Sequence, residues 1–204
     1  GYFHIYESNI QPTGLVASVQ LFKSLKDTDY HEATPFYSSK LNSVFYVLSN
    51  TENGELAFDS NGKNALAIAK QVIGGSYQLL LKDLSTSFYY PFYDDASGKL
   101  YFSADFEDSY GGTDIYYVYT NNGQVMSAPI NLGPRINSPG NEVAPYIFEN
   151  SLYFASDVFY GLGGMDIYKS NIEDDGFGTP INLGEPINTE FDDFGMIIRN
   201  DGDG

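Results

Sequence analysis

The chain has 204 residues, of which 42% are hydrophobic and 18% charged, a composition typical of a globular protein and not of a disordered one. Its 27 acidic residues outnumber 10 basic ones, and the formal charge of −17 disfavours nucleic acid and anionic lipid surfaces as partners. The absence of cysteine excludes disulfides and thiolate metal sites. No run is long and apolar enough for a transmembrane segment, and we recognise no signal peptide.

The aromatic and turn-forming residues predict an all-β fold. There are 18 Tyr, 15 Phe, 21 Gly and 9 Pro, which favours short strands joined by tight turns. Residues 1–30 contain two strand candidates, HIYES at 4–8 and VQLFKSL at 19–25. These two match the third and fourth of four strand types that recur along the rest of the chain.

Three complete sets of these four types follow, over about residues 31–86, 87–140 and 141–190. The first set comprises TPFY at 34–37, SVFYVLS at 43–49, LAFDS at 56–60 and YQLLLKDL at 77–84. The second comprises YPFY at 90–93, KLYFSAD at 99–105, an Asp-Ile-Tyr at 114–116 and APINLGPRIN at 128–137. The third comprises APYIF at 144–148, SLYFASD at 151–157, an Asp-Ile-Tyr at 166–168 and TPINLGEPIN at 179–188. Residues 191–204 contain one further first-type strand, GMII at 195–198.

Four strands in about 50 residues are the pattern of a β-propeller blade. We therefore expect a single propeller segment over 1–204, with an opening half-blade and about four blades in all. Either the strand at 195–198 closes a four-blade ring with the opening two strands, or the chain is part of a larger ring. The first complete set has about six extra residues around 61–75, which predict a rim loop or short helix for docking, or a neutral loop expansion.

The repeated motif residues have structural roles in this interpretation. The motif comprises Asp105, Gly112, Asp114 and Tyr116, and their counterparts Asp157, Gly164, Asp166 and Tyr168. The aspartates are expected to accept hydrogen bonds from turn amides, and the glycines to permit tight turns. The proline of the first strand type cannot donate to a ladder, so we expect it at a strand start.

The pattern LYFASD-x6-GG-x-DIYKS, followed by TPINLGEPINTEFDDFG, resembles the WD40-like propeller repeat of the TolB type. More narrowly, it is similar to propellers of OmpA-family, peptidoglycan-associated envelope proteins from bacteria with type IX secretion and gliding machinery. The similarity is strong over roughly 89–199 and loose over the first 88 residues. It implies a periplasmic or outer-membrane-associated chain with envelope protein partners, and peptidoglycan association through domains outside these residues.

The resemblance favours a non-catalytic protein-interaction scaffold. A glycan or peptidoglycan-fragment binding module is the alternative, and a propeller hydrolase ranks last because we find no catalytic or cofactor-binding motif. Calcium is the only ion hypothesis, because Asp201 and Asp203, and separately Asp105 and Asp108, place hard oxygens close together. The competing interpretation of these acidic residues is hydrogen bonding within turns.

Overall fold

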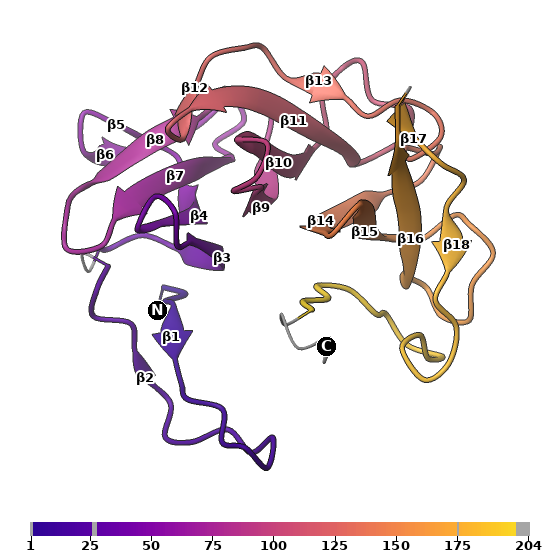
Figure 1. The fold of residues 1–204 in the computed structure, drawn as a ribbon. Coiled ribbons are helices and arrows are strands. Elements are labelled where there is room, and N and C mark those ends of the chain that lie inside the picture. Colours follow the sequence, from indigo (N-terminus) through magenta and orange to yellow (C-terminus); the bar gives the residue numbers. More distant parts are fainter. Residues whose placement is uncertain (1, 26–27, 175, 199–204) are drawn as a thin grey trace.

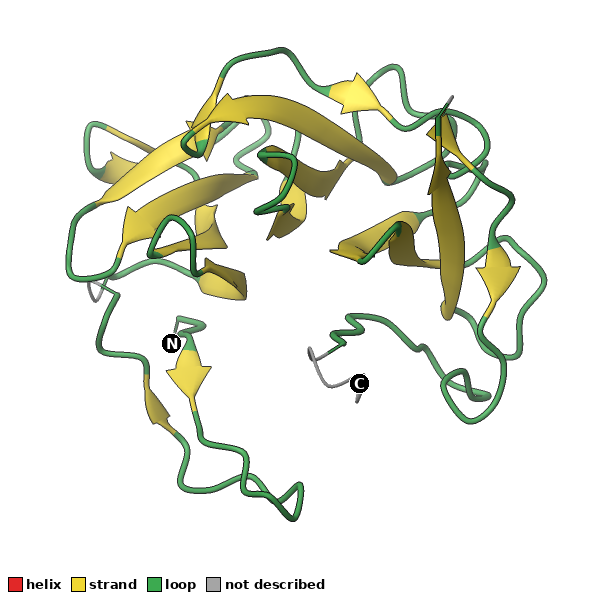
Figure 2. Cartoon of the chain, in the orientation of Figure 1, coloured by secondary structure: helices red, strands yellow, loops and turns green. Residues whose placement is uncertain are grey.

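The protein is all-β in the residues described by a computed structural model, which are 2–25, 28–174 and 176–198. No helix occurs within these ranges (Figure 2). Three antiparallel sheets follow one another along the chain and lie in an arc, with the first strand pair near one end and the C-terminal segment near the other (Figure 1). The all-β prediction is confirmed for the described residues.

Each sheet is built from strands that are consecutive in the chain. The first sheet contains β3 (Glu32–Ser38), β4 (Ser43–Ser49), β7 (Leu66–Val72) and β8 (Tyr77–Leu81). The second contains β9 (Phe88–Tyr93), β10 (Lys99–Ala104), β11 (Asp114–Asn121), β12 (Gln124–Val125) and β13 (Ile130–Asn131). The third contains β14 (Glu142–Phe148), β15 (Ser151–Ser156), β16 (Asp166–Glu173), β17 (Gly176–Phe177) and β18 (Ile181–Asn182). Two separate pairs are β1 (Tyr6–Glu7) with β2 (Gln20–Leu21), and β5 (Thr51–Glu52) with β6 (Glu55–Leu56).

The second strand of each sheet lies in the core. Every residue of β4 and β15 is buried, and so is β10 apart from Lys99. Both faces of these strands are covered because each sheet packs on its neighbour. One apolar cluster joins Phe45 of the first sheet to Phe102 of the second, and another joins Ile115 of the second sheet to Phe154 of the third. The apolar character of both faces in the sequence reflects this packing.

The third strand of the first sheet differs from the prediction. Residues 56–60 were assigned to it, but the strand is β7, and the additional residues form the β5–β6 hairpin that precedes it. The prediction of a rim loop or short helix around 61–75 is therefore wrong. β7 lacks the aspartate of its counterparts, because Ala65 and Leu66 occupy the places of Asp114 and Ile115, and this substitution hid the alignment.

Candidate functional site

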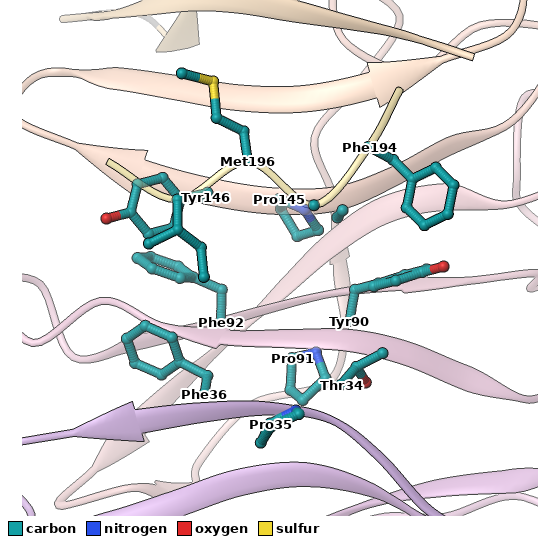
Figure 3. Close-up of a pocket in the computed structure, with 13 residues that line it drawn as sticks. Thr34, Pro35, Phe36, Tyr90, Pro91, Phe92, Pro145, Tyr146, Phe194 and Met196 are labelled. Carbon is teal, nitrogen blue, oxygen red and sulfur yellow. The ribbon is translucent and has the colours of Figure 1, made fainter. Parts of the chain in front are cut away.

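The first strands of the three sheets and the segment 194–197 surround one pocket, which we call the inner pocket (Figure 3). Its volume is about 260 Å³, and it is lined by residues 34–36, 90–92, 144–146 and 194–197. These are four copies of the same strand type. The repeat thus brings four equivalent positions together from segments far apart in the sequence.

A β-bulge interrupts the pairing of each first strand at the pocket. The register shifts in β3, β9 and β14, and the residue before the proline has a positive φ of 44° at Thr34, 48° at Tyr90 and 54° at Ala144. The fourth copy has Gly195 at this place, with a φ of 77°. A left-handed conformation is costly for non-glycine residues, and its recurrence shows that the inner pocket depends on this backbone shape.

The prolines of these strands correct a second prediction. Pro35, Pro91 and Pro145 lie within strands and not at strand starts. Each follows a bulge residue, where the ladder is already interrupted, so the missing proline N–H leaves no gap in the regular pairing.

Aromatic rings cover the walls of the inner pocket. The ring centroids of Phe36 and Phe92 are 4.6 Å apart, and those of Phe92 and Tyr146 are 5.0 Å apart. On the other side of the prolines, the rings of Tyr90 and Phe194 are 6.3 Å apart (Figure 3). All three contacts are edge-on, an arrangement that aromatic pairs favour.

The inner pocket carries no charged side chain among its lining residues, although the chain has a net charge of −17. Its polar atoms are few. Burial raises the pKa of the Tyr146 hydroxyl, which donates a hydrogen bond to the Ile198 carbonyl at 2.8 Å. The Thr34 hydroxyl oxygen is buried and has no hydrogen-bond partner among the described residues. Such a surface favours a neutral, largely apolar ligand group with one polar atom within reach of Thr34.

The repeated motif residues lie elsewhere, in the loops between sheets. Asp114 Oδ2 accepts a hydrogen bond from the Tyr110 amide at 2.8 Å, and Asp166 Oδ2 accepts one from the Leu162 amide at 2.8 Å. The expected bonding to turn amides therefore occurs at both positions. The other oxygen, Oδ1, of both aspartates is buried without a hydrogen-bond partner in the described part of the chain.

The remaining motif residues fix the same loops. Asp157 binds both the amide N–H and the side chain of Asn141, at 2.8 and 2.7 Å. The Tyr168 hydroxyl donates to the carbonyls of Phe159 and Tyr160, and Tyr116 donates to Asp108 Oδ1 at 3.0 Å.

The motif glycines allow close approach of neighbouring loops. A side chain at Gly112 would come within 2.4 Å of Asn141 Oδ1, and one at Gly164 within 2.4 Å of Asp192 Oδ1. This close approach to the following loop is the physical reason that glycine occupies both positions.

The calcium hypothesis gains no ligand cluster. Asp201 and Asp203 lie outside the described residues, and Asp105 is exposed. Within residues 2–25, 28–174 and 176–198, no group of three or more His, Asp or Glu side chains is arranged to hold a metal ion. Nor does any helix of the described residues qualify as a membrane span.

Sequence reasoning found the four first strands but did not identify the inner pocket. The signal was present, because an aromatic or aliphatic residue follows the proline position in each copy, at Phe36, Phe92, Tyr146 and Ile197. What the sequence did not show is that these four side chains converge, since convergence depends on the arc of the sheets.

No protein-family model and no curated protein matches the sequence. Among solved structures, the chain is similar to a puromycin-hydrolyzing peptidase from Mycobacterium tuberculosis, with 16% identity and a TM-score of 0.51 over 85% of this chain and 27% of the peptidase. It is also similar to an α-L-arabinofuranosidase from Lactobacillus brevis, with 12% identity and a TM-score of 0.45 over 82% of this chain and 61% of that enzyme. The chain thus spans about a quarter of the peptidase, and the likeness concerns the fold.

These comparisons correct two expectations. We expected a non-catalytic scaffold, with a glycan-binding module second and a hydrolase last, and we expected that the chain is not an enzyme. Both expectations are wrong, because the similar solved structures are hydrolytic enzymes. The comparisons give no support for the narrower resemblance to TolB-type or OmpA-family proteins.

Proposed function

We propose that the chain is the substrate-binding part of a hydrolase that acts on peptides, and that the inner pocket receives an apolar side chain of the peptide. The observation that carries the proposal is the uncharged, aromatic-lined pocket built by four equivalent strands. Its volume of about 260 Å³ exceeds that of a cavity of about 150 Å³ that holds benzene, so one aromatic side chain fits.

Two further observations support this function. A peptide contributes polar backbone groups beside each side chain, and the unpartnered Thr34 hydroxyl is a polar atom for such a group. The similar structure with a TM-score above 0.5 is that of a peptidase, which supports the class of enzyme through the fold alone. The proposal includes an arrangement of the sheets as blades of a WD40-like β-propeller, supported by the repeated strand order. A location in the periplasm or at the outer membrane rests on the sequence resemblance.

Peptide titration tests the binding half of the proposal. The acetylated amide Ala-Phe-Ala-Ala is titrated into the chain by calorimetry, beside the same peptide with Ala or Lys in place of Phe. We expect saturable binding of the Phe peptide only. Phe194→Ser should weaken it about tenfold, because burial of an aromatic side chain contributes about 1.5–3 kcal/mol. Phe191→Ser is the matched control, since Phe191 is 78% exposed and lies outside the pocket lining.

Two outcomes contradict the proposal. Equal affinity for the Phe and Ala peptides, or an unchanged affinity in Phe194→Ser, rules out the inner pocket as the binding site. Mass spectrometry of the same peptides after incubation with the protein tests hydrolysis separately. Binding without cleavage of any neutral peptide would contradict the hydrolase half.

A further inference from the structure

Residues 193–198 occupy the place of a first strand. The Asp193 amide donates to the Met165 carbonyl at 2.7 Å, just as the Glu142 amide at the start of β14 donates to the Thr113 carbonyl at 2.7 Å. Gly195 repeats the left-handed bulge of the other first strands. The segment therefore has both the position and the backbone shape of β3, β9 and β14.

This segment differs from the other first strands in having no strand beside it. In each complete sheet the first strand pairs antiparallel with the second, β3 with β4, β9 with β10 and β14 with β15. No described strand pairs with 193–198. Its side chains are correspondingly open, with Phe194 52% and Ile197 65% exposed. An unpaired strand edge with apolar side chains is a template for an additional strand.

The three complete sheets define the chemistry of the strand that fits. The second strands are SVFYVLS, KLYFSA and SLYFAS, all aromatic and aliphatic with small polar residues. The copy most similar to 193–198 is β14, because both begin with an acid that accepts from the hydroxyl four residues earlier. Ser138 Oγ donates to Glu142, and Thr189 Oγ1 donates to Asp193 at 3.0 Å.

The partner of β14 shows how the acid is recognised. Glu142 pairs with Ser156 in the register of β14 with β15, and Ser156 Oγ donates to Glu142 Oε1 at 2.6 Å. We propose that the edge at 193–198 accepts an extended strand of the Ser-Leu-Tyr-Phe-Ala-Ser type, presented by a partner polypeptide, whose final serine donates to Asp193. This interaction surface is independent of the inner pocket's role in the proposed function.

The test uses a fluorescein-labelled peptide that copies residues 150–157, Asn-Ser-Leu-Tyr-Phe-Ala-Ser-Asp, and measures its anisotropy with increasing concentrations of the whole chain. We expect saturable binding. A peptide with the Ser156→Ala change should bind about tenfold more weakly, because a hydrogen bond to a charged group contributes about 1.5–3 kcal/mol. A scrambled peptide should not bind. Hydrogen exchange should slow at 193–198 in the complex and stay unchanged at β17, which lies elsewhere.

Three results would overturn the proposal. The first is equal binding of the scrambled peptide, and the second is unchanged exchange at 193–198 in the complex. The third is a dimer of the chain alone, detected by sedimentation, in which 193–198 is already protected, since a second copy would then occupy the edge. Because only the peptides are varied, none of these results depends on the folding of a variant.

Discussion

Asn137 holds the backbone of Ile115 through two hydrogen bonds across the boundary between the second and third sheets. Asn137 Oδ1 accepts from the Ile115 amide at 2.8 Å, and its Nδ2 donates to the Ile115 carbonyl at 3.0 Å. Asn188 binds Ile167 in the same way, at 2.8 and 2.9 Å. Both asparagines are buried. Each side chain therefore joins the loop that leads to the next first strand to the third strand of the sheet it leaves.

Replacement of either asparagine should destabilise the fold strongly. Asn137→Ala leaves a buried amide and carbonyl of Ile115 without partners, and we expect a loss of about 2–3 kcal/mol in the free energy of unfolding. Urea unfolding followed by circular dichroism measures it. Asn121→Ala is the control, because Asn121 is exposed, and its effect should stay within about 0.5 kcal/mol. Equal midpoints for both variants would show that the two bonds contribute little.

The bulge before the prolines predicts a stabilising substitution. Ala144 has a φ of 54°, and glycine adopts this conformation without the cost of about 1–2 kcal/mol that a Cβ brings. After the entropy that glycine adds to the unfolded chain, Ala144→Gly should raise the free energy of unfolding by about 0.5–1 kcal/mol.

A matched substitution in the adjacent strand has the opposite sign. Ala155 lies in β15, is buried, and has no positive φ, so Ala155→Gly should lower the free energy of unfolding by about 1 kcal/mol. Thermal unfolding of both variants gives the two signs in one experiment. A loss of stability in Ala144→Gly would mean that the methyl group matters more than the strain.

The predictability of this fold depended on which residues carry the repeat. In the second and third sheets, the motifs around Asp114 and Asp166 have their full set of side-chain bonds, and the predicted strands are present. In the first sheet the aspartate is absent, and a similar-looking segment at 56–60 was taken for the strand. The inner pocket was missed because it arises from the curvature of the arc, which no local pattern encodes.

The close approach of Gly163 to the C-terminal segment gives a third prediction. A Cβ at Gly163 would lie 1.9 Å from the Phe191 carbonyl oxygen and 2.9 Å from that of Thr189. Backbone atoms cannot yield as a side chain does, so Gly163→Ala should displace the segment that leads to 193–198 and cost about 1–3 kcal/mol. Urea unfolding measures the loss, and amide exchange at 189–193 reports the displacement.

Gly178 supplies the control for this substitution. A Cβ there meets Glu173 Oε1 at 2.7 Å, which is the end of a flexible side chain and can move aside. Gly178→Ala should therefore change the free energy of unfolding by less than about 0.5 kcal/mol. If both alanines were tolerated equally, the C-terminal segment would have to lie farther from Gly163 than the structure shows.

Glu142 gives the boundary between the second and third sheets a dependence on pH. Its carboxylate is buried, and burial raises the pKa of this group above its ordinary value of 4.5. Hydrogen bonds from Ser138 and Ser156 oppose the rise, and the nearby Asp114 adds to it. Because the folded-state pKa is the higher one, the contribution of Glu142 to stability is complete below about pH 4.5. It is lost as the pH rises through the pKa of the folded state.

Glu142→Gln removes this titration and keeps the size of the side chain. The free energy of unfolding, measured by urea from pH 4 to pH 7, should fall with rising pH more steeply in the unmodified chain than in the variant. Other carboxyls, such as Asp83 with its lowered pKa, contribute equally to both chains and cancel in the difference. Parallel curves would show that Glu142 has the same pKa folded and unfolded. A difference of opposite sign would show that its serine hydrogen bonds outweigh its burial.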